Sequence, residues 1–153
     1  MKIAQMMSEN VKTCRPTDTL DMAVRLMWDH DIGAVPIVDE IGQVVGIVTD
    51  RDACMAAFMQ CQPLHCLPCT VAMSKHVVTC RPDDTDAAVA SLMAKNKIRR
   101  IPVVDDAQRP IGMLSLNDLA TAMMDGRHVL AQEVAGTLAA ICEHRSPAAL
   151  ATA

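Results

Sequence analysis

An internal duplication constrains the fold of this chain more than any other feature of its sequence. The pattern Met-Ser-x-x-Val-x-Thr-Cys-Arg-Pro-x-Asp-Thr at residues 7–19 returns at residues 73–85. The offset of 66 residues then holds without a gap as far as Asp52 and Asp118. A repeat of this length predicts two copies of one supersecondary unit, each burying its apolar face against its neighbour.

Each copy has the pattern of a β-α-β-β-α unit, because short apolar runs alternate with one amphipathic and one second helical stretch. In the first copy we expect a strand at 11–14, a helix at 20–30, strands at 34–38 and 44–49, and a helix at 50–60. A unit of about 50 residues buries too little apolar surface to be stable alone. We therefore predict an α+β fold in which the two repeats pack with pseudo-two-fold symmetry.

The expected domain boundaries follow from the duplication. Residues 1–62 form the first repeat and residues 63–126 the second, and the two make one module. Residues 127–144 place Val134, Leu138 and Ile141 at helical spacing, which predicts a further helix that covers the module or contributes to a dimer. A frayed tail is expected after it, so that residues 127–153 are the C-terminal helix and tail.

Composition and charge exclude several classes of partner. The net charge is −4, and the chain has one Trp, one Phe and no Tyr, which disfavours nucleic-acid binding by a basic field or by stacking aromatics. No run of about 18 apolar residues and no secretory signal is present, so we expect a cytoplasmic protein that does not enter a membrane. The 12 Met and 7 Cys must help fill the core, with the thiols reduced.

The two copies share a Thr/Ser-x-x-Asp motif at the predicted junction of a strand and a helix. Thr49 and Asp52 form it in the first copy, and Ser115 and Asp118 in the second. At a helix N-terminus the hydroxyl and free N–H groups suit an anion, while the carboxylate can accept hydrogen bonds from ribose hydroxyls. A capping box has the same Thr/Ser-x-x-Asp pattern. The occurrence of the motif at equivalent positions of both repeats nevertheless favours a binding role.

The residues around these motifs resemble a known family. In the first repeat these residues are Pro36-Ile37-Val38-Asp39 and 46–52, and in the second repeat they are residues 99–105 and 112–118. They are similar to the tandem CBS (cystathionine β-synthase) domain pair, and most of all to stand-alone bacterial two-repeat CBS proteins. The resemblance implies two clefts between the repeats that bind AMP, ADP, ATP, NAD or S-adenosylmethionine. It also implies a non-catalytic regulatory module that forms a homodimer and acts on an unidentified downstream protein.

The resemblance carries a set of nucleotide-binding positions onto this chain. Arg99 and Arg100 would reach phosphate groups, for which a guanidinium is well suited, although a solvated pair at a strand end is the alternative. Their counterparts are Gly33 and Ala34, so we expect two clefts with different phosphate preferences. The expected ligand-binding residues are Val11, Thr13, Pro36, Thr49, Asp52, Val77, Thr79, Arg99, Arg100, Pro102, Ser115 and Asp118.

A cysteine-rich segment between the repeats supports a second hypothesis. Cys61, His65, Cys66 and Cys69 are four soft metal ligands in nine residues, which a tetrahedral zinc ion would accept. The spacing fits no standard zinc finger, and a redox sensor or ordinary small thiols remain alternatives. Cys14 and Cys80 occupy equivalent positions and are interpreted as echoes of the duplication.

No catalytic motif is present, since the sequence lacks a Gly-rich phosphate loop, a His-Glu-x-x-His and a supported Ser/His/Asp grouping. We therefore expect no enzyme. The favoured function is a regulatory module that binds an adenine nucleotide and requires no cofactor. The alternative is a metal- or redox-responsive protein that uses the segment from Cys61 to Cys69.

Overall fold

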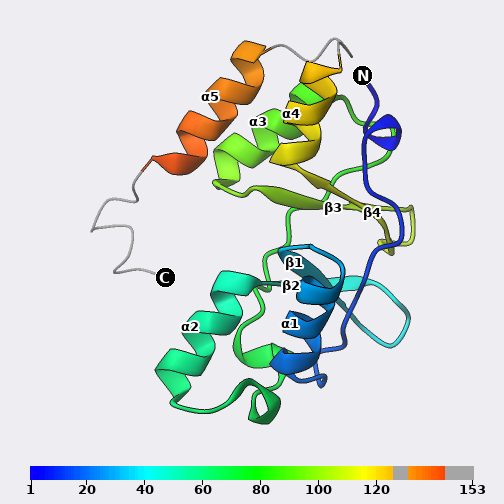
Figure 1. Ribbon diagram of the computed structural model, residues 1–153. Coiled ribbons are helices and arrows are strands. Elements are labelled where there is room, and N and C mark those ends of the chain that lie inside the picture. Colours follow the sequence, from blue (N-terminus) through cyan, green and yellow to red (C-terminus); the bar gives the residue numbers. More distant parts are fainter. Residues whose placement is uncertain (126–130, 144–153) are drawn as a thin grey trace.

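The computed structural model describes residues 1–125 and 131–143 and divides into two similar halves (Figure 1). Three short 3-10 turns, η1 to η3, accompany the main elements at Ile3–Gln5, Leu64–Cys66 and Cys69–Val71. The first half contains α1 (Leu20–Asp29), β1 (Ala34–Val38), β2 (Val44–Thr49) and α2 (Asp50–Gln60). The second contains α3 (Asp86–Asn96), β3 (Arg100–Val104), β4 (Pro110–Ser115), α4 (Leu116–Met124) and the additional helix α5 (Ala131–Cys142). The predicted α+β duplication is confirmed.

The two hairpins share one register, as expected of a duplication. β1 pairs antiparallel with β2 from Ala34 opposite Thr49, and β3 pairs with β4 from Arg100 opposite Ser115. Each pair has a register shift near its turn, between Ile37 and Val38 in the first and at the equivalent point in the second. The end of β2 and helix α2 in the first repeat therefore have the same arrangement as the end of β4 and helix α4 in the second.

The expected first strand at residues 11–14 forms only a single parallel bridge. Cys14 donates its N–H to the Pro36 carbonyl over 3.2 Å and accepts from Val38 N over 2.9 Å. The Arg15-Pro16 turn follows at once, so the chain leaves the sheet after one residue. Cys80 makes the same bridge with Val103 in the second half.

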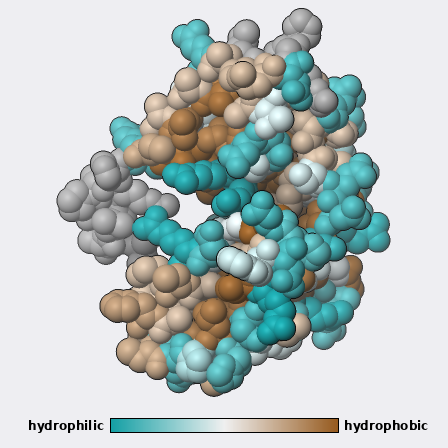
Figure 2. All heavy atoms as spheres, viewed as in Figure 1, coloured by the Kyte–Doolittle hydropathy of each residue, from teal (hydrophilic) through white to brown (hydrophobic). Residues whose placement is uncertain are grey.

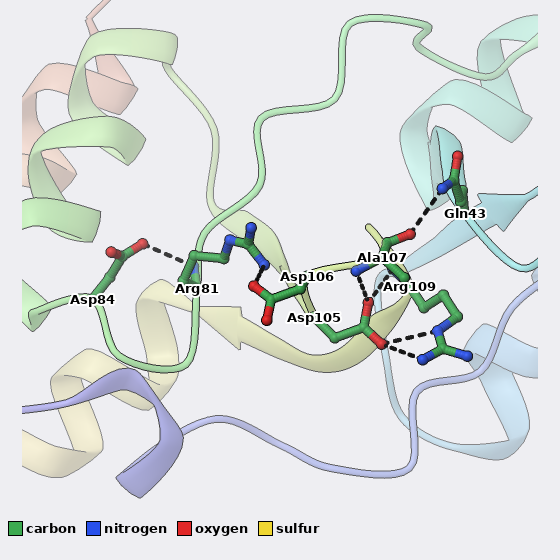
Figure 3. A network of polar contacts seen from close by, with 7 residues as sticks. All are labelled: Gln43, Arg81, Asp84, Asp105, Asp106, Ala107 and Arg109. Carbon is green, nitrogen blue, oxygen red and sulfur yellow. Dashed lines mark hydrogen bonds and ion pairs between the residues drawn. The ribbon is translucent and has the colours of Figure 1, made fainter.

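The two hairpin turns join the halves to each other (Figure 3). Asp105 Oδ1 accepts the N–H groups of Ala107 and Arg109, both over 2.9 Å, and the hydrogen bond from Arg109 lowers the pKa of this carboxyl. Asp39 closes the first turn in the same way. Gln43 Nε2 then donates to the Ala107 carbonyl over 2.9 Å, which links one turn to the other.

Each half completes its hydrophobic core with the segment that precedes the other repeat in the chain. Ile3 is fully buried in the second-half core with Val89, Ile101 and Leu114. In the same way, Leu67 and Cys69 are buried in the first-half core. Figure 1 shows the N-terminal segment beside α3 and α4, away from α1 and α2. The repeats therefore exchange the segments that precede them, and neither core is complete without this exchange.

Close packing accompanies this exchange at two strand glycines. A Cβ on Gly112 would lie 3.0 Å from Met7 Cγ, and a Cβ on Gly46 would lie 2.8 Å from Met73 Sδ. These are equivalent contacts in the two halves. Each methionine side chain can lie directly on the strand because the glycine there has no side chain.

Helix α5 packs against the second half (Figure 1). It lies on α3 and α4, where Thr137 is buried and its Oγ1 donates to the Ala90 carbonyl over 3.5 Å. Lys97 and Glu143 form an ion pair of 3.1 Å at its end. The predicted helix at 127–144 is present as Ala131–Cys142, and residues 127–130, residue 144 and the expected tail lie outside the described residues. No helix in the described part of the chain has the length and apolar character needed to cross a membrane.

Candidate functional site

A cleft of about 840 Å³ opens between the two halves of the protein. Figure 2 shows the surface hollowed between the upper and lower halves. Its volume lies within the range of roughly 300–1,000 Å³ that is common for small-ligand sites. The lining combines residues 8–12, residues 30–34, Arg99 and Arg100, residues 113–118 and, from α5, Leu138.

The N-terminus of α4 forms one wall of this cleft. Ser115 and Asp118 make a capping box, in which Asp118 Oδ2 accepts from Ser115 N over 2.7 Å and from Ser115 Oγ over 2.6 Å. Asp118 N in turn donates to Ser115 Oγ over 3.2 Å. Asp118 Oδ1 has no partner among the described residues, so this oxygen remains available to hydroxyl groups of a ligand.

Most N–H groups of the first turn of α4 are already used. Leu116 N donates to the Arg99 carbonyl over 2.9 Å, and Asp118 N is held by the cap. Within the described parts of the chain, Asn117 N–H is the first-turn donor without a protein acceptor. The helix N-terminus therefore supplies fewer donors than its sequence suggests, and anion binding requires further groups.

Those groups are Arg99 and Arg100, which both line the same cleft. Arg99 is exposed and Arg100 half-buried, and neither guanidinium has an ion pair or hydrogen bond within residues 1–125 and 131–143. The Arg100 guanidinium lies against Gly33 of the other half, where a Cβ would come within 2.8 Å of Arg100 Cζ. Two unpaired cations that line a cleft together with the capping carboxylate of Asp118 suit a ligand that carries both phosphate and hydroxyl groups.

The structure brings together five of the twelve predicted nucleotide-binding residues. Val11, Arg99, Arg100, Ser115 and Asp118 line the 840 Å³ cleft. Among the others, Pro36 and Pro102 are buried in β1 and β3. The remaining predicted residues, which also do not line this cleft, are Thr13, Thr49, Asp52, Val77 and Thr79.

Thr49 and Asp52 repeat the capping box at α2. Asp52 Oδ2 accepts from Thr49 N over 2.9 Å and from Thr49 Oγ1 over 2.6 Å. The two caps are thus built alike, as the duplicated motif indicates. A second cleft at Thr49 and Asp52 stays a prediction.

Sequence reasoning missed several residues of the cleft. Lys12, His30 and Asp31 line it. The positions of His30 and Asp31 suggest an ordinary solvated helix end. In the structure Asp31 adopts a left-handed conformation with φ 52° at the end of α1, which turns the chain toward the second half. The left-handed residue at the equivalent Lys97, with φ 53°, shows that this turn belongs to the repeat.

The structure does not assemble the predicted zinc ligands. Among the described residues, no three His, Cys, Asp or Glu side chains are grouped to hold a metal ion. Cys69 is buried in the first-half core, whereas Cys61, His65 and Cys66 are exposed. Proximity in sequence failed as a guide here because Cys69 begins a 3-10 turn of its own and is buried, whereas the turn Leu64–Cys66 contains no buried residue.

The fold and the cleft together define a duplicated α+β module with a ligand site between its repeats. The model of the CBS domain matches residues 3–58 and again residues 70–125. The chain therefore belongs to the CBS domain family, and the resemblance found in the sequence is confirmed.

Relatives of the chain include both short proteins and large enzymes. The CBS domain-containing protein YhcV of Bacillus subtilis is 34% identical over 118 residues, which are 77% of this chain and 82% of YhcV. A homoserine O-acetyltransferase of Methanococcoides burtonii is 33% identical over 117 residues, 76% of this chain, but the match spans only 23% of that enzyme. The likeness to the enzyme is thus confined to a small part of it.

Solved structures include close matches in fold. The CBS domain pair of protein MJ0100, in complex with 5′-methylthioadenosine and S-adenosyl-L-methionine, superposes with a TM-score of 0.74. It is 28% identical, and the comparison covers 83% of this chain and 98% of that one.

Proposed function

We propose that this protein is a non-catalytic regulatory module of the cytoplasm that binds an adenosine-containing ligand in the 840 Å³ cleft. The candidates are AMP, ADP, ATP, NAD and S-adenosylmethionine. The second half supplies the anchoring groups, with Asp118 Oδ1 accepting from ribose hydroxyls and the arginine pair binding the charged part of the ligand.

One observation carries this proposal. Arg99 and Arg100 are unpaired in the described residues and line the same cleft as Asp118, whose Oδ2 serves the helix cap. Solvated arginines at a strand end need not face a cavity, whereas a ribonucleotide requires cationic and hydroxyl-binding groups side by side. The MJ0100 domain pair, which binds two adenosine derivatives, supports this ligand class.

The ligand class can be tested by isothermal titration with each of the five candidates. We expect at least one to bind with a dissociation constant well below millimolar, and Asp118→Ala to weaken it by at least tenfold. Asp52→Ala is the matched control, because Asp52 makes the same cap at α2 but does not line this cleft. Absence of binding by all five ligands, or equal effects of the two substitutions on the stronger site, would overturn the proposal.

A regulatory role requires that the ligand change the shape or assembly of the protein. A ligand shifts a conformational equilibrium only if it binds the two states with different affinity. The cleft joins groups from both halves, so its occupation favours one relative placement of the repeats. We also propose that the protein acts as a homodimer, whose packing a downstream protein senses.

A further inference from the structure

Two buried cysteines that lie far apart in the sequence meet in the first-half core. Cys14 and Cys69 belong to one cluster of buried residues and are 3% and 0% exposed. Each thiol shifts the pKa of the other, and Cys69 Sγ donates to the Thr19 carbonyl over 3.9 Å. The contact is held by backbone bonds nearby, because Cys69 N donates to the Asp18 carbonyl over 2.7 Å and Thr70 N to the Pro16 carbonyl over 3.3 Å.

The second half of the protein shows what packing alone requires at these positions. Cys80 is equivalent to Cys14 and is equally buried, but Ile3 stands where the first half has Cys69. The backbone arrangement is the same, since Ile3 N donates to the Asp84 carbonyl over 3.0 Å. An aliphatic side chain therefore fills this core position, and a pair of thiols is a special feature of the first half.

We propose that Cys14 and Cys69 are an oxidative cross-linking site, at which a peroxide converts the two thiols into a disulfide. The Cys14 sulfur attacks one oxygen of hydrogen peroxide, which gives a sulfenic acid and one water. The Cys69 sulfur then attacks the Cys14 sulfur, which forms the S–S bond and releases a second water. The protein loses two hydrogens and two electrons, the peroxide is reduced to two waters, and a dithiol reverses the change.

The electrostatic surroundings fit this order of events. The interaction with Cys69 lowers the pKa of the Cys14 thiol, whereas the interaction with Cys14 and burial raise the pKa of the Cys69 thiol. Cys14 is therefore the thiolate that reacts first, and Cys69 is already in place to resolve it. Burial, together with the negative charge of Asp84, raises the pKa of Cys80 to about 12, and no second thiol lies at position 3.

The cross-link would join residue 14 to the segment that completes the first-half core. Leu67 and Cys69 are the buried residues of this segment, whose 3-10 turns are its only regular structure within the described chain. A disulfide restricts the unfolded chain between the joined residues and thereby stabilises the fold. Oxidation would thus fasten the linker between the repeats onto the first repeat.

The test uses a variant of the full chain in which the exposed cysteines Cys54, Cys61, Cys66 and Cys142 are replaced by Ser. The folded protein is treated with hydrogen peroxide, alkylated and digested for mass spectrometry. We expect a peptide pair linked through Cys14 and Cys69, with Cys80 recovered as a free thiol. The melting temperature should rise on oxidation and return after dithiothreitol.

The duplication offers matched controls for this experiment. Cys69→Ile copies the second half into the first, so the protein should fold as before and form no disulfide. Ile3→Cys in that background should transfer the cross-link to Cys80. The proposal is overturned if Cys14 and Cys69 both stay free in the folded variant, or if they join only in denaturant.

Discussion

The structural role of Asp118 leaves room for the binding role proposed for it. Asp118 uses Oδ2 for the helix cap and leaves Oδ1 free, so the capping box and the ribose-binding interpretation of its motif are compatible. Arg100 reaches the cleft across the surface of Gly33, which has no side chain to obstruct it. Position 33 thus controls where this guanidinium lies.

Gly33→Ala should weaken ligands that carry phosphate and leave adenosine unaffected. The added Cβ would collide with the Arg100 guanidinium and displace it, with a loss of affinity of about tenfold if one charge-assisted hydrogen bond is lost. Titration calorimetry with AMP and adenosine measures the effect. In the Arg100→Ala background the same substitution should cause no further loss, and an equal loss in both backgrounds would contradict this role of Gly33.

At the scale of secondary-structure elements, the exchanged N-terminal segments connect the two cores. Met7 crosses β4 at Gly112, and Met73 crosses β2 at Gly46. Each strand is thus covered by a segment that precedes the other repeat in the chain. The packing of these elements is what makes two small units into one module.

Gly112→Ala should destabilise the protein by about 1–3 kcal/mol through overpacking against Met7. Thermal or urea unfolding measures the change. Met7→Ala removes the side chain that the new Cβ meets, so Gly112→Ala should cost much less in that background. If the two substitutions are simply additive, the contact between Met7 and position 112 is not the cause.

The helix caps give a second prediction at this scale. Ser115→Ala removes the Oγ that accepts from Asp118 N, and a lost N-cap costs about 1 kcal/mol. Thr49→Ala should cost a similar amount, because the cap at α2 has the same geometry. Denaturant unfolding compares the two variants, and a much larger loss for either would show that its hydroxyl has a role beyond capping.

On the scale of the whole molecule, the halves differ in how their helices are covered. Helix α5 lies on α3 and α4, whereas α1 and α2 expose Trp28, Phe58 and Met59 at 87%, 74% and 72%. Figure 2 shows hydrophobic surface over α2 at the lower left. Large apolar side chains exposed together are typical of an interface, and the proposed homodimer would account for them if it buries α2.

If the first half forms this interface, Phe58→Glu should dissociate the dimer. Met124→Glu is the matched control, because Met124 is the equivalent residue of α4 and is 79% exposed. Analytical ultracentrifugation distinguishes the outcomes. Dissociation by both substitutions would indicate that both halves lie in the interface, and no dimer in the unchanged protein would remove the homodimer from the proposed function.

Local patterns along the chain are enough to predict the duplication and the bounds of most elements. The strands at 34–38 and 44–49 and the helix at 50–60 coincide with the structure, because local apolar periodicity and N-cap residues specify them. The motif ending at Asp118 was found for the same reason. Both repeats carry the Thr/Ser-x-x-Asp motif at equivalent positions, so each copy supports the interpretation of the other.

Which residues from different parts of the chain meet is visible in the tertiary structure and not in any local pattern. It replaced the strand at 11–14 by one bridge, brought Asp31 into the cleft, and separated Cys69 from its sequence neighbours to join Cys14. It also packed Ile3 into the core of the other half. Such contacts depend on how two whole repeats and their exchanged segments fill space, and no local pattern of residues encodes that packing.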